Sequence, residues 1–426
     1  MRKDIHVYYG EGIQKVELSQ RDEVVLRGML AEQHRWTRIT PAGKRSVEPL
    51  ITDFQRIDGR FCVVNPGPYV GIVALNDVQL IFNSPKWLKG LDNNHLYYML
   101  IRSNPLSPKT VDLPEMPSEQ TVSADGLLEP LFNLFVSEAY SALKKGVYKT
   151  YVKEENVSPN LKGKLDFRRQ IKLEISSKPY FATQRQVFTE RNPLNELLFW
   201  ACKVIESHSN NNRTQALVEQ LLKMLPVFKK PNLGNMLVVQ PERRGFHLRW
   251  AVQLAKLVVN KESISFQGHQ EQLFSMVINL FDLFESYVAS ELMLRDAKFK
   301  HQFELPFVDN TVIANNGWDK RRVFPDLVYN DGDKFVLDVK MKRIRSSGTE
   351  IEDIYQLHFY ASLLGVSKAV LVHPTNQPIA EIKKFPVSYN PENVIEIICY
   401  GLPIVGSREE MTRSIEELYQ FLMTSV

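Results

Sequence analysis

The sequence predicts an α+β protein of several parts, with a β-rich N-terminal region, a helical middle and a C-terminal α/β core built on a mixed sheet. Short apolar runs separated by Gly, Pro and Asn fill the first hundred residues. Apolar residues at helical spacing follow, and then helices, a hairpin and buried strands alternate. The expected parts are 1–120, 121–269 and 270–426.

Length and composition are those of an ordinary globular protein. The 426 residues suggest two or three domains, and the net charge of +4 neither requires nor excludes nucleic acid. The cysteines, Cys62, Cys202 and Cys399, lie far apart, which argues against a disulfide framework and fits a reducing cytosol. No apolar run approaches about 18 residues, and no signal-peptide core begins the chain. We therefore expect a cytoplasmic protein without a membrane partner.

The elements of the first two parts follow from these patterns. Strands are expected at 61–65, 69–75 and 78–82, and a Pro-rich connector at 104–118 ends the first part. The middle part is expected to contain helices at 127–145, 195–207, 214–224 and 250–259, with a β-like basic insert at 147–169.

The C-terminal part begins with a helix expected at 273–294, in which Glu285 stands within an apolar and aromatic pattern. A hairpin follows, and then a helix near 349–364, with capping-box chemistry from Thr349 and Glu352 and with Gly365 at its end. Buried strands at 369–372 and 394–399 and a helix at 415–423 complete it.

The hairpin carries two acids and a lysine. A turn at 330–333 separates two β-prone runs, so that folding 323–329 against 334–339 brings Asp326 to the far end of the second strand. Alternation along that strand places Asp338 and Lys340 on one face. Such a face can hold a hard divalent cation beside an ammonium group, as metal-dependent phosphodiester cleavage requires.

The residue types suggest a role for each group. Asp326, Asp338 and the Val339 backbone carbonyl are candidate cation ligands, and Glu285 is a further ligand or a base. Lys340 can orient or help to deprotonate a water and can stabilise developing charge. The alternative is a hairpin whose charged ends have no chemical role. The apolar run before Asp338 favours the first interpretation.

A polar pair on the next helix supports the same site. Gln356 and Tyr360 are four residues apart and share one helix face. A Gln amide can orient a carboxylate or a water, and a Tyr hydroxyl can meet a phosphate, so both are candidate catalytic residues. On its own, such a pair is also typical of an ordinary helix surface.

Basic runs flank the hairpin on both sides. We expect them to contact DNA phosphates, although solvated loop ends are the alternative. The residues are Lys320, Arg321, Arg322, Lys342, Arg343 and Arg345. A second basic cluster, at Lys162, Lys164, Arg168 and Arg169, fits DNA or partner contact and plain surface equally well.

Together these residues resemble a known family. The pattern Asp326…Asp338-Val339-Lys340, with Glu285 upstream and a Gln356-centred helix downstream, resembles the PD-(D/E)xK nuclease superfamily and its RecB-type branch. The whole chain resembles McrC, the nuclease subunit of modification-dependent McrBC restriction systems. Supporting stretches are 70–75, 81–86, 161–166 and 191–195. Val339 departs from the Ala that the family often has there, and 86–121 has no clear counterpart.

The resemblance implies a restriction-endonuclease-like core in 270–426 and an Mg²⁺-dependent endonuclease that cuts double-stranded DNA, with Mn²⁺ as a second candidate metal. It also implies a partner, a McrB-like AAA+ GTPase expected to form a hexameric ring, which reads modified DNA and translocates. The N-terminal part would dock into that ring and stimulate its GTPase. The sequence has no GxxxxGK[ST] loop, so no nucleotide is expected to bind this chain.

Two other functions remain open from the sequence. One is a stand-alone RecB-like nuclease in DNA repair, which would cut without a GTPase. The other is a non-catalytic adaptor that binds DNA or activates a GTPase, against which the intact set of Asp326, Asp338 and Lys340 argues.

Overall fold

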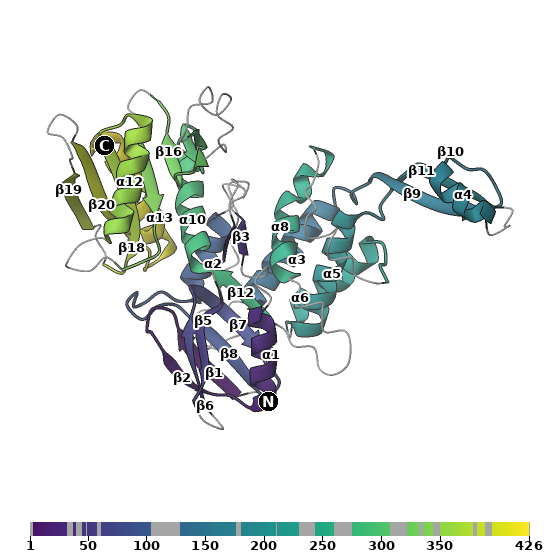
Figure 1. Ribbon diagram of the computed structural model, residues 1–426, viewed down its shortest axis with the longest axis horizontal. Helices are drawn as coiled ribbons and strands as arrows, with labels where there is room; N and C mark the ends of the chain where they lie inside the picture. The colour runs from purple at the N-terminus through teal and green to yellow at the C-terminus, as the bar shows by residue number, and fades with distance from the viewer. Residues whose placement is uncertain are drawn as a thin grey trace. The chain divides into compact units, whose positions relative to one another are not determined.

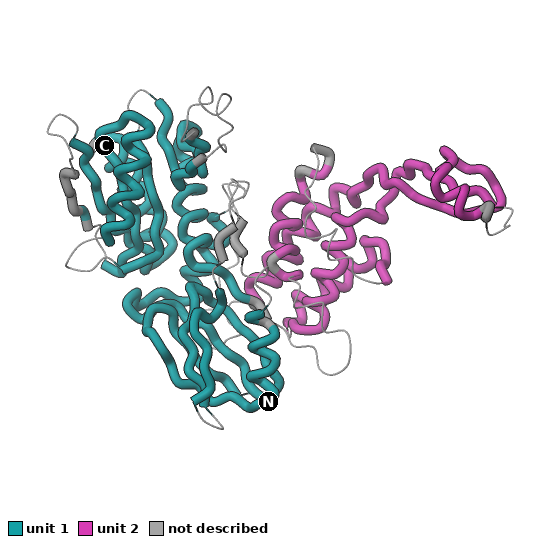
Figure 2. The backbone as a smooth tube through the Cα atoms, in the orientation of Figure 1, with its two compact units in different colours: residues 1–127, 273–426 teal, residues 128–272 magenta. Residues whose placement is uncertain are grey.

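The computed structural model describes most of the chain, and the account below is confined to that part. The described residues are 3–31, 37–39, 45–47, 49–57, 61–103, 128–175, 180–209, 211–229, 243–259, 275–306, 322–331, 335–343, 350–377, 381–387 and 394–425. They form two compact units, 1–127 with 273–426 and 128–272 (Figure 2). None of the described helices has the length and apolar character needed to cross a bilayer. The expected connector at 104–118 lies outside the described residues.

The N-terminal region is β-rich, as predicted. One sheet has the order β1-β8-β7-β12, and a second has the order β2-β6-β5. Their strands are β1 (Lys3–Tyr8), β2 (Gln14–Glu17), β5 (Ile51–Arg56), β6 (Phe61–Pro66), β7 (Tyr69–Ala74), β8 (Val78–Asn83) and β12 (Ser275–Asn279). A short hairpin joins β3 (Thr37–Ile39) and β4 (Arg45–Val47). Helix α1 (Gln20–Ala31) places Leu26 in the core with Val7 and Leu80, and the sequence analysis did not foresee it.

The predicted helix at 273–294 is wrong at its start. Residues 275–279 form β12, which pairs antiparallel with β7, and helix α10 begins only at Leu280 and ends at Arg295. The Asn279 side chain accepts hydrogen bonds from the backbone N–H groups of Phe281 and Asp282, which caps the helix at that point. Val277 and Ile278 are β-branched and suit a strand, so the apolar pattern alone did not locate the boundary.

The C-terminal region is built on a mixed sheet in the order β13-β16-β17-β18-β20-β19 (Figure 1). The contacts β17–β18 and β18–β20 are parallel, and the other neighbours are antiparallel. The strands are β13 (Phe299–His301), β16 (Leu327–Tyr329), β17 (Phe335–Val339), β18 (Lys368–Thr375), β19 (Glu381–Val387) and β20 (Ile395–Pro403). Beside them, β14 (Leu305–Pro306) pairs with β15 (Arg322–Val323). Both expected strands are present. The expected hairpin is present but shorter than predicted, since 327–329 pair with 335–337 and Val323 belongs to β15, while part of the turn, 332–334, lies outside the described residues.

Helices cover this sheet. Helix α12 (Ile351–Leu364) packs Leu357 and Ala361 against alternate residues of the central strands, among them Val336 and Leu371. It ends at Gly365, whose φ of 66° permits the left-handed C-cap, as predicted. The expected capping box is not seen: Thr349 lies outside the described residues, and the N-cap, Glu350, makes no side-chain cap. Helix α13 (Arg408–Ser425) is longer than predicted and packs Phe421 against Tyr400 of β20.

The second unit combines a helical core with a β-hairpin. The expected helices appear as α3 (Leu128–Leu143), α5 (Pro193–His208), α6 (Asn212–Met224) and α8 (Arg249–Val258), with a 3-10 helix at Arg243–Leu248. The stretch at 191–195 starts α5, where the side-chain amides of Asn192 and Asn195 both donate to the Tyr148 carbonyl. The basic insert forms β9 (Thr150–Ser158) and β10 (Lys164–Leu165), which pair with β11 (Phe181–Thr189), and α4 (Phe167–Ile175).

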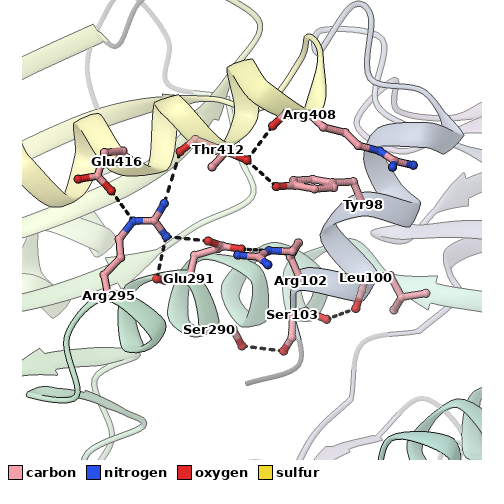
Figure 3. Close-up of polar contacts among 10 residues, drawn as sticks. All are labelled: Tyr98, Leu100, Arg102, Ser103, Ser290, Glu291, Arg295, Arg408, Thr412 and Glu416. Atoms are coloured by element: carbon pink, nitrogen blue, oxygen red, sulfur yellow. Dashed lines mark hydrogen bonds and ion pairs between the residues drawn. The ribbon is translucent and has the colours of Figure 1, made fainter. Parts of the chain in front are cut away.

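The parts 1–120 and 270–426, predicted as separate, belong to one compact unit, and independent folding of each stays a prediction. Helix α2 (Asn93–Arg102) contacts α10, and the ion pair of Arg102 with Glu291 joins the two (Figure 3). Glu291 of α10 is 1% exposed and is paired with Arg102 of α2 and with Arg295, whose guanidinium lies 2.7 Å from Glu291 Oε2. Arg295 also lies 2.9 Å from Glu416 of α13. The network therefore joins three helices.

We predict that Glu291→Ala lowers the free energy of unfolding by about 3 kcal/mol, because it leaves two arginines without their buried partner. Glu416→Ala is the matched control, since that carboxylate is 49% exposed and its loss should cost less than about 1 kcal/mol. Urea titration followed by circular dichroism measures both. Equal effects of the two substitutions would contradict the assignment of Glu291 as the centre of the network.

Candidate acidic site

The hairpin brings Asp326 to the end of β17. Leu327 pairs with Leu337, and the backbone N–H of Val339 donates to Asp326 Oδ2 at 2.8 Å. This contact holds the carboxylate beside the strand segment that contains Asp338. The two acids therefore meet at the carboxyl end of β17, where the chain leaves a parallel strand pair.

Asp338 is fully buried, and Lys340 is its ion-pair partner. Lys340 Nζ lies 3.0 Å from Asp338 Oδ2, and the Asp338 side chain is 0% exposed. Among the described residues, Oδ1 has no hydrogen-bond donor placed to serve it. Burial raises the pKa of Asp338, and the rise remains although Lys340, and after it Asp326, act to lower this pKa. A buried carboxylate with an open oxygen is suited to binding a cation.

The pKa of Asp326 is also raised. Burial raises its pKa well above the ordinary value, and the neighbouring charges of Asp338 and Glu285 raise it further. For Lys340, burial acts to lower the pKa, but Asp338 and Asp326 outweigh it and the pKa is raised. Lys340 is therefore cationic at neutral pH. One ammonium thus faces two acids whose pKa values are raised, and a divalent cation bound there would favour their ionised forms.

Glu285 lies close to this pair but is held by other residues. It is 4% exposed on α10, and its Oε1 accepts a hydrogen bond from the side-chain amide of Gln302 at 2.9 Å. His301 Nε2 lies 3.1 Å from the same oxygen. Through its backbone N–H, Gln302 also donates to the Asp326 carbonyl at 2.7 Å.

In the predicted polar pair of α12, Tyr360 lies near the acids and Gln356 contacts Tyr360. The Gln356 amide donates to the Tyr360 hydroxyl at 2.9 Å. Burial raises the pKa of Tyr360, the Gln356 contact lowers it, and Asp338 and Asp326 raise it. Because both acids influence Tyr360, its hydroxyl belongs to the same electrostatic environment, and Tyr360 is a neutral hydrogen-bonding group at physiological pH.

The basic runs are only partly described. Lys342 lies 2.6 Å from Asp353 and 2.7 Å from Glu350, so its ammonium is already paired with acids at the start of α12. Arg343 has an exposed side chain. Lys320, Arg321, Arg345 and the side chain of Arg322 lie outside the described residues. DNA contact by these residues stays a prediction, and for Lys342 it competes with two ion pairs.

The acids fit a hard divalent cation in number and type. Among the described residues, no group of three or more His, Cys, Asp or Glu is arranged as a ready metal site. Mg²⁺, however, is usually held by one or two carboxylates and completes its shell with waters and substrate phosphates. Asp326 and Asp338, with the Val339 carbonyl as a candidate, match that pattern. Glu285 is a weaker candidate ligand than the two aspartates, because His301 and Gln302 already contact its Oε1.

Three residues of this site could not be identified from the sequence: His301, Gln302 and Asp353. His301 belongs to no metal-binding spacing, and Gln302 follows a short strand without any turn signal. Asp353 shows no pattern that separates it from surface acids of a helix. The contacts of these residues depend on the fold, and no local sequence pattern indicates them.

Comparison with known proteins assigns the family. Residues 64–374 match the model of a family described as McrBC 5-methylcytosine restriction system component. The chain belongs to this family. The match spans α10, the hairpin, α12 and the greater part of β18, so the acidic site lies within the McrBC family region. The sequence-based resemblance is confirmed at the level of the family.

A solved structure shares the fold, and a second gives a weaker match. A chain of the refined half-complex from the tetradecameric assembly of Thermococcus gammatolerans McrB AAA+ hexamers with bound McrC is 16% identical, with a TM-score of 0.56 over 98% of this chain and 100% of that chain. A chain of the cryo-EM structure of the Thermococcus gammatolerans McrBC complex is 17% identical over 70% of this chain and 90% of that one, with a TM-score of 0.42. No curated protein sequence matches the chain significantly.

We predict that Asp326→Asn stabilises the cation-free chain at neutral pH by roughly 0.5 to 2 kcal/mol, because it removes a half-buried charge that loss of hydration disfavours while Asn Oδ1 still accepts from Val339. When the pKa of a carboxyl is higher in the folded than in the unfolded chain, the free energy of unfolding falls as the pH rises from the unfolded pKa of about 4 through the folded pKa. The stabilisation by Asn should therefore grow between pH 5 and pH 8.

Thermal melts in EDTA measure this effect, with the exposed Asp4→Asn as the control expected to change nothing. A lower melting temperature for Asp326→Asn at pH 8 would show that the ionised Asp326 stabilises the fold, contrary to this account.

Proposed function

We propose that the chain is the DNA-cleaving subunit of a McrBC-type restriction complex and hydrolyses phosphodiester bonds with Mg²⁺. The observation that carries this proposal is the pair of Asp338, which is fully buried, and Asp326, which is half-buried and whose pKa is raised by loss of hydration, with Lys340 as the ion-pair partner of Asp338. A structural role alone offers no reason to desolvate two like charges beside one counter-ion. Membership of the McrBC family supplies the setting.

The arrangement also supports a PD-(D/E)xK core in the C-terminal region. A helix with an acid (α10), an antiparallel hairpin with two acids and a lysine (β16–β17), a helix with Gln356 (α12) and a parallel strand (β18) follow in this order. Asp338 and Lys340 are two residues apart and their side chains meet, as alternation along one strand face requires.

Each side chain has a distinct task in this proposal. Asp326 and Asp338 would hold the cation, together with the Val339 carbonyl, and Glu285 stands behind them. A bound divalent cation supplies neutralisation of phosphate charge and activation of a water. Lys340 keeps its proton on Nζ because of the two acids, so it stabilises negative charge at the scissile phosphate and orients the attacking water. Tyr360, whose hydroxyl accepts a hydrogen bond from the Gln356 amide, would donate a hydrogen bond to a phosphate oxygen.

The partner in this proposal is a separate McrB-like AAA+ GTPase. The chain has no phosphate-binding loop of its own, so GTP hydrolysis requires another polypeptide. The fold similarity extends over 98% of this chain to a structure of McrB AAA+ hexamers with bound McrC. We infer that the partner recognises 5-methylcytosine-containing DNA and that the N-terminal region docks to it and stimulates its GTPase.

Two alternatives give different experimental results. A stand-alone RecB-like nuclease would degrade DNA in Mg²⁺ without any GTPase. A non-catalytic adaptor would bind DNA or stimulate the GTPase, but would be insensitive to loss of the acids. The extent of the family match, 64–374, favours the restriction subunit over both, because it reaches well beyond the acidic site.

We predict that Asp338→Ala lowers cleavage of methylated DNA by roughly 1,000-fold in the complete complex with GTPase, GTP and Mg²⁺, since the cation supplies several kcal/mol. GTP hydrolysis by the same complex should stay within about twofold of wild type, because the substitution leaves the partner unchanged. Asp331→Ala is the matched control: this exposed acid of the same hairpin pairs with Lys298, and its loss should leave cleavage intact.

Full cleavage by the Asp338→Ala complex would refute the site assignment. Efficient cleavage by the wild-type chain without a GTPase would instead refute the partner assignment and favour the stand-alone nuclease. A wild-type complex that hydrolyses GTP but never cuts modified DNA would favour the adaptor.

A further inference from the structure

Gln302 has an unusual backbone conformation at the edge of the acidic site. Its φ is 48°, and it is the single non-glycine residue with positive φ in the described part of the chain. A long side chain in the left-handed region is strained, and such strain persists where the surroundings fix it, often at functional sites. Gly or Asn would satisfy this turn with less strain.

The strained turn lets one residue reach two acids. Gln302 follows β13, which pairs with β16, and its backbone N–H continues that pairing by donating to the Asp326 carbonyl at 2.7 Å. Its side-chain amide donates to Glu285 Oε1 at 2.9 Å. The amide oxygen is buried and has no hydrogen-bond partner among the described residues, so the described contact that orients this side chain is the one with Glu285.

We propose that Gln302 is a positioning residue of the acidic site, which fixes Glu285 of α10 relative to Asp326 of the hairpin. The expected loss of kcat rests on the proposed nuclease function. The expected position of the Glu285 carboxylate does not. Asn has one methylene fewer and cannot span the same distance to Glu285 from this backbone, whereas Gly keeps the backbone contact and loses the amide. The length of the Gln side chain is therefore what allows residue 302 to contact Glu285.

His301 supports the same arrangement without replacing Gln302. Its Nε2 lies 3.1 Å from the oxygen that the Gln302 amide also contacts. His301 belongs to β13, so its backbone has ordinary extended geometry and does not contact Asp326 in the way that Gln302 does. Gln302 thus contacts both the Glu285 carboxylate and the Asp326 backbone, whereas the described side-chain contact of His301 is with Glu285.

The test compares Gln302→Gly and Gln302→Asn with wild type in the complete complex. Both substitutions suit positive φ, so the melting temperature should stay within about 3 °C of wild type. We expect the rate constant of cleavage, kcat, to fall roughly 10- to 100-fold, as for residues that orient the ligands of a metal. KM for DNA should stay within about twofold, because Gln302 acts through the acids and not on DNA.

Gln215→Ala is the matched control. Gln215 is a half-buried glutamine of α6 whose side-chain amide donates to the Glu206 carbonyl at 3.0 Å and to the Ser209 carbonyl at 2.7 Å. The substitution removes comparable hydrogen bonds outside the acidic site and outside the N-terminal region, so it should lower the melting temperature and leave kcat unchanged. A kcat loss in the Gln302 variants that merely followed their melting temperatures would overturn the positioning role.

A crystal structure of Gln302→Gly separates this inference from the proposed function. We expect the Glu285 carboxylate to leave its wild-type place while the fold and the Asp326 backbone stay unchanged. Glu285 in its wild-type place, or a wild-type kcat for Gln302→Gly, would overturn the inference. A wild-type complex that never cuts DNA would refute the nuclease proposal alone, and the position of Glu285 would still decide the role of Gln302.

Discussion

The burial of two carboxylates side by side is the constraint on which the acidic site depends. Both carboxyls lose hydration, and the charge of Asp338 raises the cost of ionising Asp326 further. Lys340 and the Val339 N–H offset part of this cost. The site still has two acids and one lysine. A divalent cation that also binds a phosphate would balance their charge. The other parts of the site can be understood as supports for this pair.

Helix α10 shows how the same protein treats a structural acid differently. Glu291 is as buried as Asp338, but two arginines from α2 and α10 pair with it and complete its hydrogen bonding. Glu285, six residues earlier, instead points to the edge of β13 and is held by His301 and Gln302. Fully paired acids stabilise the helix packing, and the incompletely paired one, Asp338, marks the place where chemistry is expected.

Much of this could be predicted from the sequence, and the failures have physical causes. The hairpin, the strands at 369–372 and 394–399, and Gly365 followed from alternation and turn chemistry, which act within a few residues. The start of α10 was misplaced because an apolar run fits a strand as well as a helix, and Asn279 decides between them. Gln302 and the ion pairs of Lys342 were invisible because they depend on contacts between distant segments.

The most direct test of the central claim is to locate the cation itself. Crystals of the chain grown with Mn²⁺ would give an anomalous difference map at the manganese absorption edge. If Asp326 and Asp338 hold the cation, the map has a peak within coordination distance of both acids, and no such peak for Asp338→Ala. Well-ordered acids without a peak, at Mn²⁺ concentrations that support cleavage by the complex, would contradict the central claim.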